Sequence, residues 1–442
     1  MSDFDTTRRG ALALFGSTFL AGCSELGVGR GDSGPELDRS KLRTVASGEF
    51  PDASRTFPVD ISTAFVDENV ARARAALDSV PDPLGSEEVP NGAIREEMAH
   101  ERTSAEDALD RATAAASSYE RLDAAVDARE HAANLRGAWR AIDEDLTRAA
   151  VAERASSVRE DLSAFTDRRE YVGSDPVRAV LVHEEFEHRV ARADSELDLN
   201  SGPQRRYDAD NPLAVGETAA AVERARANVA VANHVYDRFT DSLDEPRPLD
   251  NRLERAIATL GGRLSEALDD VPRETDGERP TFVERDIEDT VAGMALDDLY
   301  GEARDARNYR YEGERPAAAV IRMHRLLAGV EAFRTLRDRV ADGESFPVES
   351  TGDVAAYRTA AVEAVEAARA TDDYPLLTGV ELPKVVARLS RADDELTPGD
   401  DGDDDAIRAR WVRREIATYV AQRHVAEAIP NACRTTGDAL SE

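Results

Sequence analysis

The sequence of 442 residues contains only two cysteines and two tryptophans, and aromatic residues make up 5% of it. Because Cys23 and Cys433 allow at most one disulfide, the fold cannot depend on a disulfide framework or a cysteine-rich metal site. The chain has no Cys-x-x-Cys, no His-Glu-x-x-His, no glycine-rich phosphate loop and no Gly-x-Ser-x-Gly. It therefore lacks the short motifs that mark common zinc proteases, nucleotide-binding enzymes and serine hydrolases.

Positive charge is also scarce, since 56 basic residues face 89 acidic ones and the net charge is −33. Only Lys41 and Lys384 are lysines, and the other 54 basic residues are arginines. This acidic, lysine-poor composition resembles that of proteins from salt-loving archaea, in which carboxylates hold hydration while salt screens their repulsion. Charge of this sign opposes contact with nucleic acid, so we expect no nucleic-acid partner.

The N-terminal leader carries the most specific motif in the chain. Arg8 and Arg9 precede an apolar run over 11–21 that is too short to cross a bilayer. The run ends in Leu20-Ala21-Gly22-Cys23, which resembles the lipobox of secreted lipoproteins, and Arg8-Arg9 resembles a twin-arginine export signal. The resemblance implies a signal peptide over 1–22, lipid on Cys23 and a location at the extracytoplasmic face of the membrane.

Two compositional regions follow the leader. Residues 23–59 are glycine-rich at first and show no apolar period, which predicts a flexible tether with one short strand near 42–50. From residue 60 onward, alanine, arginine, aspartate and glutamate dominate, and apolar residues recur every three or four positions. This pattern predicts an all-α fold.

Seven-residue spacing marks the first long helices. It relates Met98, Ala105, Ala112, Tyr119, Val126 and Ala133, and then Val151, Val158, Phe165 and Val172, with a change of phase near 134–137. We expect two long antiparallel helices, or one broken helix, between about 91 and 173. Further helices are expected over about 175–197, 212–243, 249–270, 285–307, 316–341, 354–371, 382–396 and 403–428.

Two sequence patterns occur twice. Leu77-Asp-Ser-Val-Pro81 recurs as Leu268-Asp-Asp-Val-Pro272, and the pattern Arg-Ala-Asp-x-Glu-Leu occurs over 192–197 and 391–396. Chance matching in so biased a composition is one explanation. A divergent duplication is the other, with multi-helix bundles over 60–245 and 246–432 and a loose tail over 433–442.

The duplication draws attention to the histidines. Aligned on these patterns, His131 pairs with His324 and His234 with His424, so each pair could bind a metal or an anion, or could simply pack between helices.

A second cluster of possible ligands lies in 183–188. His183 and Glu187, and Glu184 and His188, are spaced to share one face of a helix. Glu-x-x-His occurs at 97–100 and 185–188 and resembles the ligand spacing of di-iron bundles. We expect no cofactor on the leading interpretation and a metal at His183, Glu184, Glu187 and His188 on the alternative.

The last predicted helix contains His424-Val-Ala-Glu427. It resembles part of the Gly-x-His-x-x-Glu marker of imelysin-like proteins, which are duplicated helical bundles tied to iron uptake. Gln422 stands where the glycine should be, so the resemblance is architectural.

These observations predict a lipid-anchored, non-enzymatic binding or structural protein with an unknown protein or small-molecule partner. The alternatives are a metal-dependent helical bundle and a ligand-capture component of a transporter or sensor. A polar pocket at the junction of the two halves would favour ligand capture.

Overall fold

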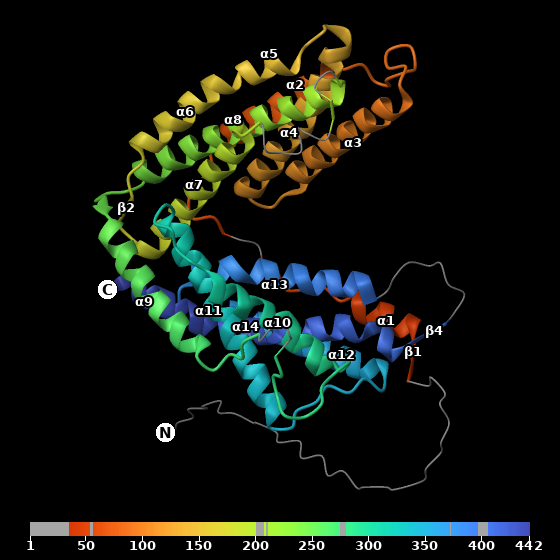
Figure 1. Cartoon of the computed structure of the whole chain (residues 1–442), viewed down its shortest axis with the longest axis vertical. Coiled ribbons are helices and arrows are strands. Elements are labelled where there is room, and N and C mark those ends of the chain that lie inside the picture. The colour runs from red at the N-terminus through yellow and green to blue at the C-terminus, as the bar shows by residue number, and fades with distance from the viewer. Residues whose placement is uncertain are drawn as a thin grey trace, which may run out of the picture. The chain divides into compact units, whose positions relative to one another are not determined.

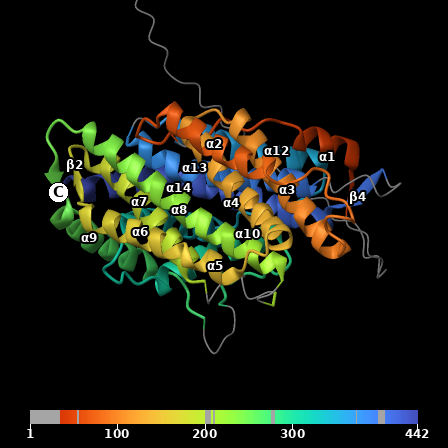
Figure 2. The ribbon, with the colours of Figure 1, turned by 90° about the horizontal axis from the view of Figure 1, so that it is seen from above.

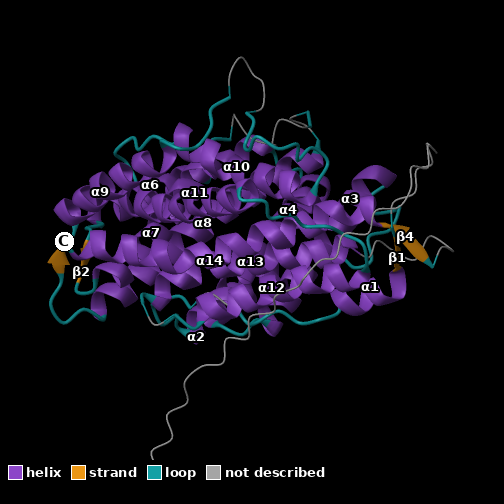
Figure 3. Cartoon of the chain, turned by 90° about the horizontal axis from the view of Figure 1, so that it is seen from below, coloured by secondary structure: helices purple, strands orange, loops and turns teal. Residues whose placement is uncertain are grey.

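The structure, a computed structural model, describes residues 35–53, 56–199, 207–208, 211–274, 280–371, 373–396 and 405–442. The predicted signal peptide, with Arg8, Arg9 and Cys23, lies outside the described residues. Helix accounts for 74% of the chain and strand for 3%, which confirms the all-α prediction. Figure 3 shows the strands as short pieces among the helices.

The first bundle contains the helices α2 to α8 (Figure 1). They are α2 (Thr63–Asp78), α3 (Gly92–Ala114), α4 (Ser118–Asp143), α5 (Arg148–Glu153), α6 (Ala155–Arg168), α7 (Pro176–Leu197) and α8 (Pro212–Asp241). Helix α4 packs against α2, α3 and α8, and α8 also packs against α5, α6 and α7. The α5 and α6 helices follow one another along α8 (Figures 1 and 2).

The second bundle repeats this order. Its helices are α9 (Asp250–Leu268), α10 (Val291–Asn308), α11 (Pro316–Ala341), α12 (Thr351–Arg369), α13 (Pro375–Leu396) and α14 (Arg413–Ser441). Helix α11 packs against α9, α10 and α14, and α14 also packs against α12 and α13. The single helix α12 takes the place of α5 and α6. The pairs of helices that pack in the first half also pack in the second, where α14 additionally packs against α9 and α10.

The two repeated patterns occupy the same places in both bundles. The Leu-Asp-x-Val-Pro patterns lie at the ends of α2 and α9, and an arginine from the next helix donates to the carbonyls of each turn. Arg102 of α3 donates to the oxygens of Val80 and Pro81 at 3.0 Å. Arg307 of α10 donates to those of Leu268, Val271 and Pro272 at 2.9–3.2 Å. The Arg-Ala-Asp-x-Glu-Leu patterns are the last six residues of α7 and α13. This shared local structure supports duplication over chance.

Polar caps fix where several helices begin. Ser117 and Glu120 form a reciprocal capping box at the start of α4, as do Ser350 and Asp353 at the start of α12. At the start of α8, Asn211 accepts from the amide of Leu213, and proline fills the first helical position. The start of α8 agrees with the prediction, and α12 begins three residues before the predicted start at 354. The start of α4 at Ser118 was not predicted, although its capping box is a local signal.

The seven-residue series does form a buried seam, but its change of phase does not mark a break. Met98, Ala105, Ala112 and Val126 are 0–3% exposed. The helices end instead at 114 and 143. At 134–137, α4 crosses α8 closely, since a Cβ on Gly137 would lie 2.7 Å from Ala219 Cβ and 3.0 Å from Gly216 Cα. The glycine is there because the two backbones approach, not because the helix stops.

The predicted tether is too long at its C-terminal end. Strand β1 (Glu36–Asp38) pairs with β4 (Ala406–Arg408), and helix α1 (Arg39–Ala46) packs on α12 and α13. Leu37 and Leu42 are each 1% exposed. Asp38 accepts from the amides of Ser40 and Lys41, so 39–46 is a helix and the predicted strand at 42–50 is wrong.

The predicted loose tail is also wrong. Helix α14 continues through Pro430 to Ser441 and buries Cys433 completely. The prediction ended the helix near 428 because proline lacks the backbone donor and usually stops a helix. Burial raises the pKa of the Cys433 thiol to about 11, so it stays protonated at neutral pH.

Two small features complete the fold. Strand β2 (Val172–Gly173) pairs with β3 (Arg247–Pro248), and the 3-10 helix η2 (Ala409–Val412) leads into α14. Among the described helices, none combines the length and apolar character that crossing a membrane requires.

Candidate functional site

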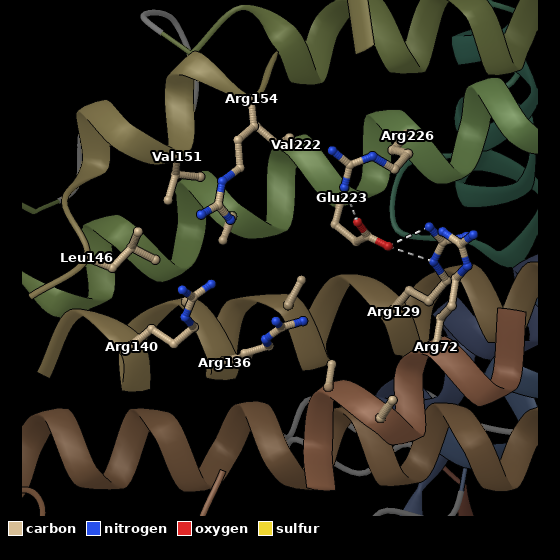
Figure 4. Close-up of a pocket in the computed structure, with 15 residues that line it drawn as sticks. Arg72, Arg129, Arg136, Arg140, Leu146, Val151, Arg154, Val222, Glu223 and Arg226 are labelled. Atoms are coloured by element: carbon tan, nitrogen blue, oxygen red, sulfur yellow. Dashed lines mark hydrogen bonds and ion pairs between the residues drawn. The ribbon is translucent and has the colours of Figure 1, made fainter. Parts of the chain in front are cut away.

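A groove of about 360 Å³ opens in the first bundle between α2, α4, the α5–α6 junction and α8 (Figure 4). We call it the arginine groove, because six arginines and one acidic residue line it. These seven residues are Arg72, Arg129, Arg136, Arg140, Arg154, Arg226 and Glu223. The apolar lining consists of Ala75, Ala76, Ala133, Gly137, Leu146, Val151, Ala219 and Val222.

The charge of the groove is opposite to that of the chain. Six guanidinium groups and one carboxylate give the lining a formal charge of +5, whereas the whole chain carries −33. Arginine stays protonated at any ordinary pH and presents five donors in a planar fork. The groove therefore concentrates permanent positive charge and hydrogen-bond donors in a concave site.

One end of the groove is internally paired. Arg129 is 3% exposed, its Nε donates to Glu223 Oε1 at 2.9 Å, and its Nη1 donates to Asn69 Oδ1 at 2.5 Å. The second oxygen of Glu223 accepts from Arg226 Nη1 at 2.8 Å. Helices α2, α4 and α8 are thus joined through one buried guanidinium, which fixes the floor of the groove.

The other end is open. Arg136 and Arg140 point from α4 toward Arg154, which descends from the short break between α5 and α6 (Figure 4). Arg140 pairs with Glu144 at 2.7 Å, and that hydrogen bond lowers the pKa of Glu144. Across the described part of the chain, no carboxylate lies within ion-pair distance of Arg136 or Arg154. Two guanidinium groups at this end are therefore available to a ligand.

The equivalent surface of the second bundle is a pocket between α9, α11 and α14. Five residues of α11 line it, Leu327, Glu331, Arg334, Thr335 and Asp338. Counted from the first residue of each helix, they occupy the same positions as the five α4 residues of the arginine groove, Arg129, Ala133, Arg136, Gly137 and Arg140. On this one helix the two grooves correspond, whereas the α8 and α14 residues that line them lie at different distances from their helix starts. We call the second one the counterpart groove for its α11 face alone.

The counterpart groove has the opposite charge. Two arginines, Arg263 and Arg334, line it with four acidic residues, Glu331, Asp338, Asp438 and Glu442. Arg334 occupies the position of Arg136, but Asp338 stands at that of Arg140, and Leu327 at that of Arg129. The positive charge of the first groove is thus a property of its side chains and not of the shared architecture.

The predicted metal cluster in 183–188 lies on α7 but does not converge on one point. His183 is fully buried, and its Nε2 lies 2.9 Å from the carbonyl oxygen of Val172. Glu187 accepts from the Tyr171 hydroxyl at 2.6 Å and from the amides of Ala317 and Ala318. His183 and Glu187 thus have structural contacts, whereas His188 is exposed. Within the described residues no three His, Cys, Asp or Glu side chains gather as metal ligands.

Glu187 instead connects the two bundles. Its two oxygens bind backbone amides at 3.1 and 2.6 Å in the first turn of α11, where the helix has free donors. Burial raises the pKa of this carboxyl. Close by, Oε1 of Glu184 lies 3.9 Å from Nη2 of Arg325 in α11.

A polar pocket of about 360 Å³ lies at this junction. It is lined by Glu184 and His188 of α7 and, from the second bundle, by Tyr309, Arg310, Tyr311, Glu312, Glu314, Arg315, Ala318, Ala319, Arg322 and Arg325. Four arginines and three glutamates line it, so its formal charge of +1 is closer to neutral than that of the arginine groove.

The paired histidines lie at different distances from their helix starts and have different partners. His131 lies 13 residues after the start of α4, and His324 lies 8 residues after the start of α11. His131 is half-buried and bonded to Glu101 at 2.8 Å, whereas His324 is fully buried beside Thr436 at 3.1 Å. The two histidines therefore have different surroundings.

The second pair differs in the same way. His234 stacks on Phe65 and accepts from the amide of Ser62 at 3.3 Å. His424 is buried, and its Nδ1 lies 2.8 Å from the carbonyl oxygen of Val420 in its own helix. Neither pair forms two copies of one site.

Buried histidine predicts acid sensitivity. Burial lowers the pKa of both His183 and His324 to about 4, whereas an unfolded histidine titrates near 6.5. Below pH 6.5 the unfolded chain binds protons that the folded chain does not, so their contribution is complete above pH 6.5 and is lost toward pH 4. As the pH falls through that window, each histidine should lower the free energy of unfolding by about 1.4 kcal/mol per pH unit.

Urea unfolding at pH 7 and pH 5 checks this prediction. Between pH 7 and pH 5, the free energy of unfolding of the double variant H183Q/H324Q should fall by about 4 kcal/mol less than that of the natural chain. Each histidine is expected to account for about 2 kcal/mol of the difference, all of it between pH 6.5 and pH 5. Equal losses in both proteins would show that the two imidazoles already bind protons in the folded state.

Together the fold and the groove define an all-helical protein of two similar bundles, the first with a cationic ligand-sized site. Residues 64–245 match a family model described as a domain of unknown function (DUF8262), and residues 250–438 match a second one (DUF8264). The two adjacent domains cover most of the chain. Neither the search of curated proteins nor that of solved structures found a match.

Sequence reasoning missed the arginine groove. The available signal was the spacing of Arg129, Arg136 and Arg140, which at i, i+7 and i+11 share one face of a helix. With 54 arginines in the chain, that spacing alone does not distinguish a site from a solvated face.

Proposed function

We propose that the protein is a non-enzymatic binding protein at the outer face of the cell membrane, and that the arginine groove is its ligand site. The observation that carries the proposal is a concave site of +5 formal charge in a chain of −33. Its polar lining consists of permanently charged guanidinium groups and one carboxylate that Arg129 and Arg226 hold. Such groups bind and orient a ligand but do not exchange protons near neutral pH.

A thermal-shift screen tests this function. The library should span anionic, neutral and cationic small molecules at the salt concentration that keeps the protein folded. A ligand present at 100 times its dissociation constant adds about 2.7 kcal/mol of stability, which a melting curve resolves. If no class of compound raises the melting temperature, the proposed binding function is wrong.

We further propose that lipid on Cys23 anchors the chain after twin-arginine export. The supports are Leu20-Ala21-Gly22-Cys23, the pair Arg8-Arg9 and the short apolar run between them. An acidic, lysine-poor surface suits an extracytoplasmic location in a salt-loving archaeon, where external salt screens the carboxylates.

The replacement C23S should release the protein from the membrane. We expect the natural chain in the membrane pellet and most of C23S in the soluble extracytoplasmic fraction, because a thioether-linked lipid would be the attachment. The double variant R8K/R9K should instead accumulate inside the cell. Recovery of C23S in the pellet at the natural level would contradict lipid attachment at this residue.

The pocket at the junction of the bundles favours a second function, ligand capture for a transporter or sensor. Residues of both bundles line this pocket, so an occupant would contact Glu184 and His188 on one side and Arg322 and Arg325 on the other. Cross-linking in intact cells separates the two functions. Ligand capture requires a membrane protein that cross-links more strongly when ligand is present.

A further inference from the structure

We infer that the arginine groove binds a small multivalent oxyanion, such as an oligophosphate or a polycarboxylate, with Arg136, Arg140 and Arg154 as its direct contacts. The inference rests on the proposed function, because it takes the groove to be the ligand site, and it adds the chemical class of the ligand.

The open end carries a local surplus of positive charge. Arg136 and Arg154 approach from opposite walls, with Arg140 one turn along α4 from Arg136 (Figure 4). Glu144 pairs with Arg140 and is the carboxylate whose pKa all three arginines lower. One exposed carboxylate against three guanidinium groups leaves a surplus of two positive charges. An anion bound between the walls would remove that repulsion.

The geometry favours several charged oxygens over one. Each guanidinium can bind two oxygens of a carboxylate or phosphate in parallel. Three such groups on two walls exceed what a single carboxylate can fill. A ligand with two or more anionic groups can contact both walls at once.

The arginines at the paired end already have protein partners, so the ligand should contact the arginines at the open end. Arg129 and Arg226 already bind both oxygens of Glu223, and Asn69 takes a further donor of Arg129. These residues hold α2, α4 and α8 together and position the groove. Removing them would damage the wall and the site together, so they are unsuitable for a test of binding.

The size and the walls fit a small molecule. A volume of about 360 Å³ is within the range of natural small-ligand sites. Leu146, Val151 and Val222 give the groove apolar surface beside the charged groups. This surface lowers the local dielectric response and strengthens ion pairing within the groove.

The counterpart groove acts as a control inside the same chain. Its α11 face uses the same five helix positions, but its lining charge is −2, from two arginines and four acidic residues. If the arginines of the first groove were only a consequence of arginine-rich helices, the second groove should carry them as well. It carries Arg334 at the position of Arg136, but Asp338 at the position of Arg140.

Isothermal titration of the full folded chain tests the inference. The probes are inorganic tripolyphosphate, citrate and, as a monovalent control, acetate. Tripolyphosphate or citrate should bind at least tenfold more tightly than acetate and weaken as salt is raised. The variant R136Q/R154Q should weaken the tighter probe at least tenfold. Both arginines are exposed at the surface, so circular dichroism should show unchanged folding.

The matched control is R263Q/R334Q, which removes the same charge from the counterpart groove and should leave binding within twofold. An equal loss in both variants would show a general charge effect and would overturn the inference. Absence of binding by both multivalent probes would also overturn it. A neutral or cationic hit in the thermal-shift screen would then leave the proposed binding function intact, so the two failures are distinguishable.

Discussion

Replacing Arg358 by methionine is expected to lower the free energy of unfolding by about 3–5 kcal/mol. Arg358 is 7% exposed, and its Nε and Nη2 donate to the carboxylate of Asp393 at 2.8–3.1 Å. Asp393 is 5% exposed and also accepts from the Tyr419 hydroxyl at 2.6 Å. Methionine preserves the apolar volume but removes the charge, so a buried carboxylate loses its counter-ion.

The same substitution should loosen the N-terminal segment. The guanidinium of Arg358 donates to the carbonyl oxygen of Gly48 and lies 4.4 Å from the ring centre of Phe50. Hydrogen exchange of α1 should therefore accelerate together with the loss in stability. Both effects follow from one side chain that joins 36–50 to α12 and α13.

Urea unfolding at constant salt measures the effect, with R388M as its control. Arg388 pairs with Glu302 at 3.0 Å at the surface, where an ion pair contributes at most about 1 kcal/mol. The double variant R358M/D393L should recover part of the loss, because it removes both buried charges. Similar losses in R358M and R388M would contradict the buried-pair explanation.

Replacing Gly216 by valine is the second large perturbation. A Cβ at this position would meet the side-chain oxygen of Asn134 and would lie 2.7 Å from its backbone oxygen. A backbone atom cannot rotate away, so α4 and α8 must separate. Overpacking of this kind costs about 1–3 kcal/mol, and the valine side chain should place the effect at the upper end.

Scanning calorimetry of G216V should show a lower melting temperature. Anion binding should weaken too, since Arg136 and Arg140 lie on the displaced helix. Gly261, which lies inside α9, is the matched control, because a Cβ on it would have no neighbouring atom within 4 Å. The variant G261A should be neutral or more stable by up to about 1 kcal/mol. An unchanged melting temperature in G216V would show that the crossing is looser than the structure indicates.

Local signals made the helices predictable from sequence. Helix α11 begins at Pro316 and ends at Ala341, as predicted, because proline fills its first turn and its apolar period is clear. Prolines misled where tertiary packing overrides them. Pro383 lies inside α13, which begins before the predicted start at 382 and buries Leu377. Pro430 lies inside α14, which continues past the predicted end at 428 and buries Cys433.

The duplication was only partly readable. Patterns at helix ends, such as 192–197 and 391–396, kept their register because capping and turn formation constrain them. No such signal fixes the register of the histidines in the helix interiors, since repeats of alanine, arginine and acidic residues allow several alignments. Counting from helix starts pairs His131 with Gly329, whereas the repeated patterns pair it with His324.

The candidate site depends on contacts that sequence spacing cannot supply. Arg72, Arg136, Arg154 and Arg226 lie on separate elements, and each is unremarkable within its own helix. Their common environment arises from the close crossing of α4 and α8 and from the break between α5 and α6. Only the tertiary arrangement shows that three helices and the α5–α6 junction direct arginines into one groove.

The most direct test of the account is a crystal structure of the full folded chain with tungstate, a heavy oxyanion with strong anomalous scattering. The account predicts an anomalous peak in the arginine groove, with tungstate oxygens within hydrogen-bonding distance of Arg136 and Arg154, and none in the counterpart groove beside Arg334. A peak in the counterpart groove, or no peak between Arg136 and Arg154, would contradict it.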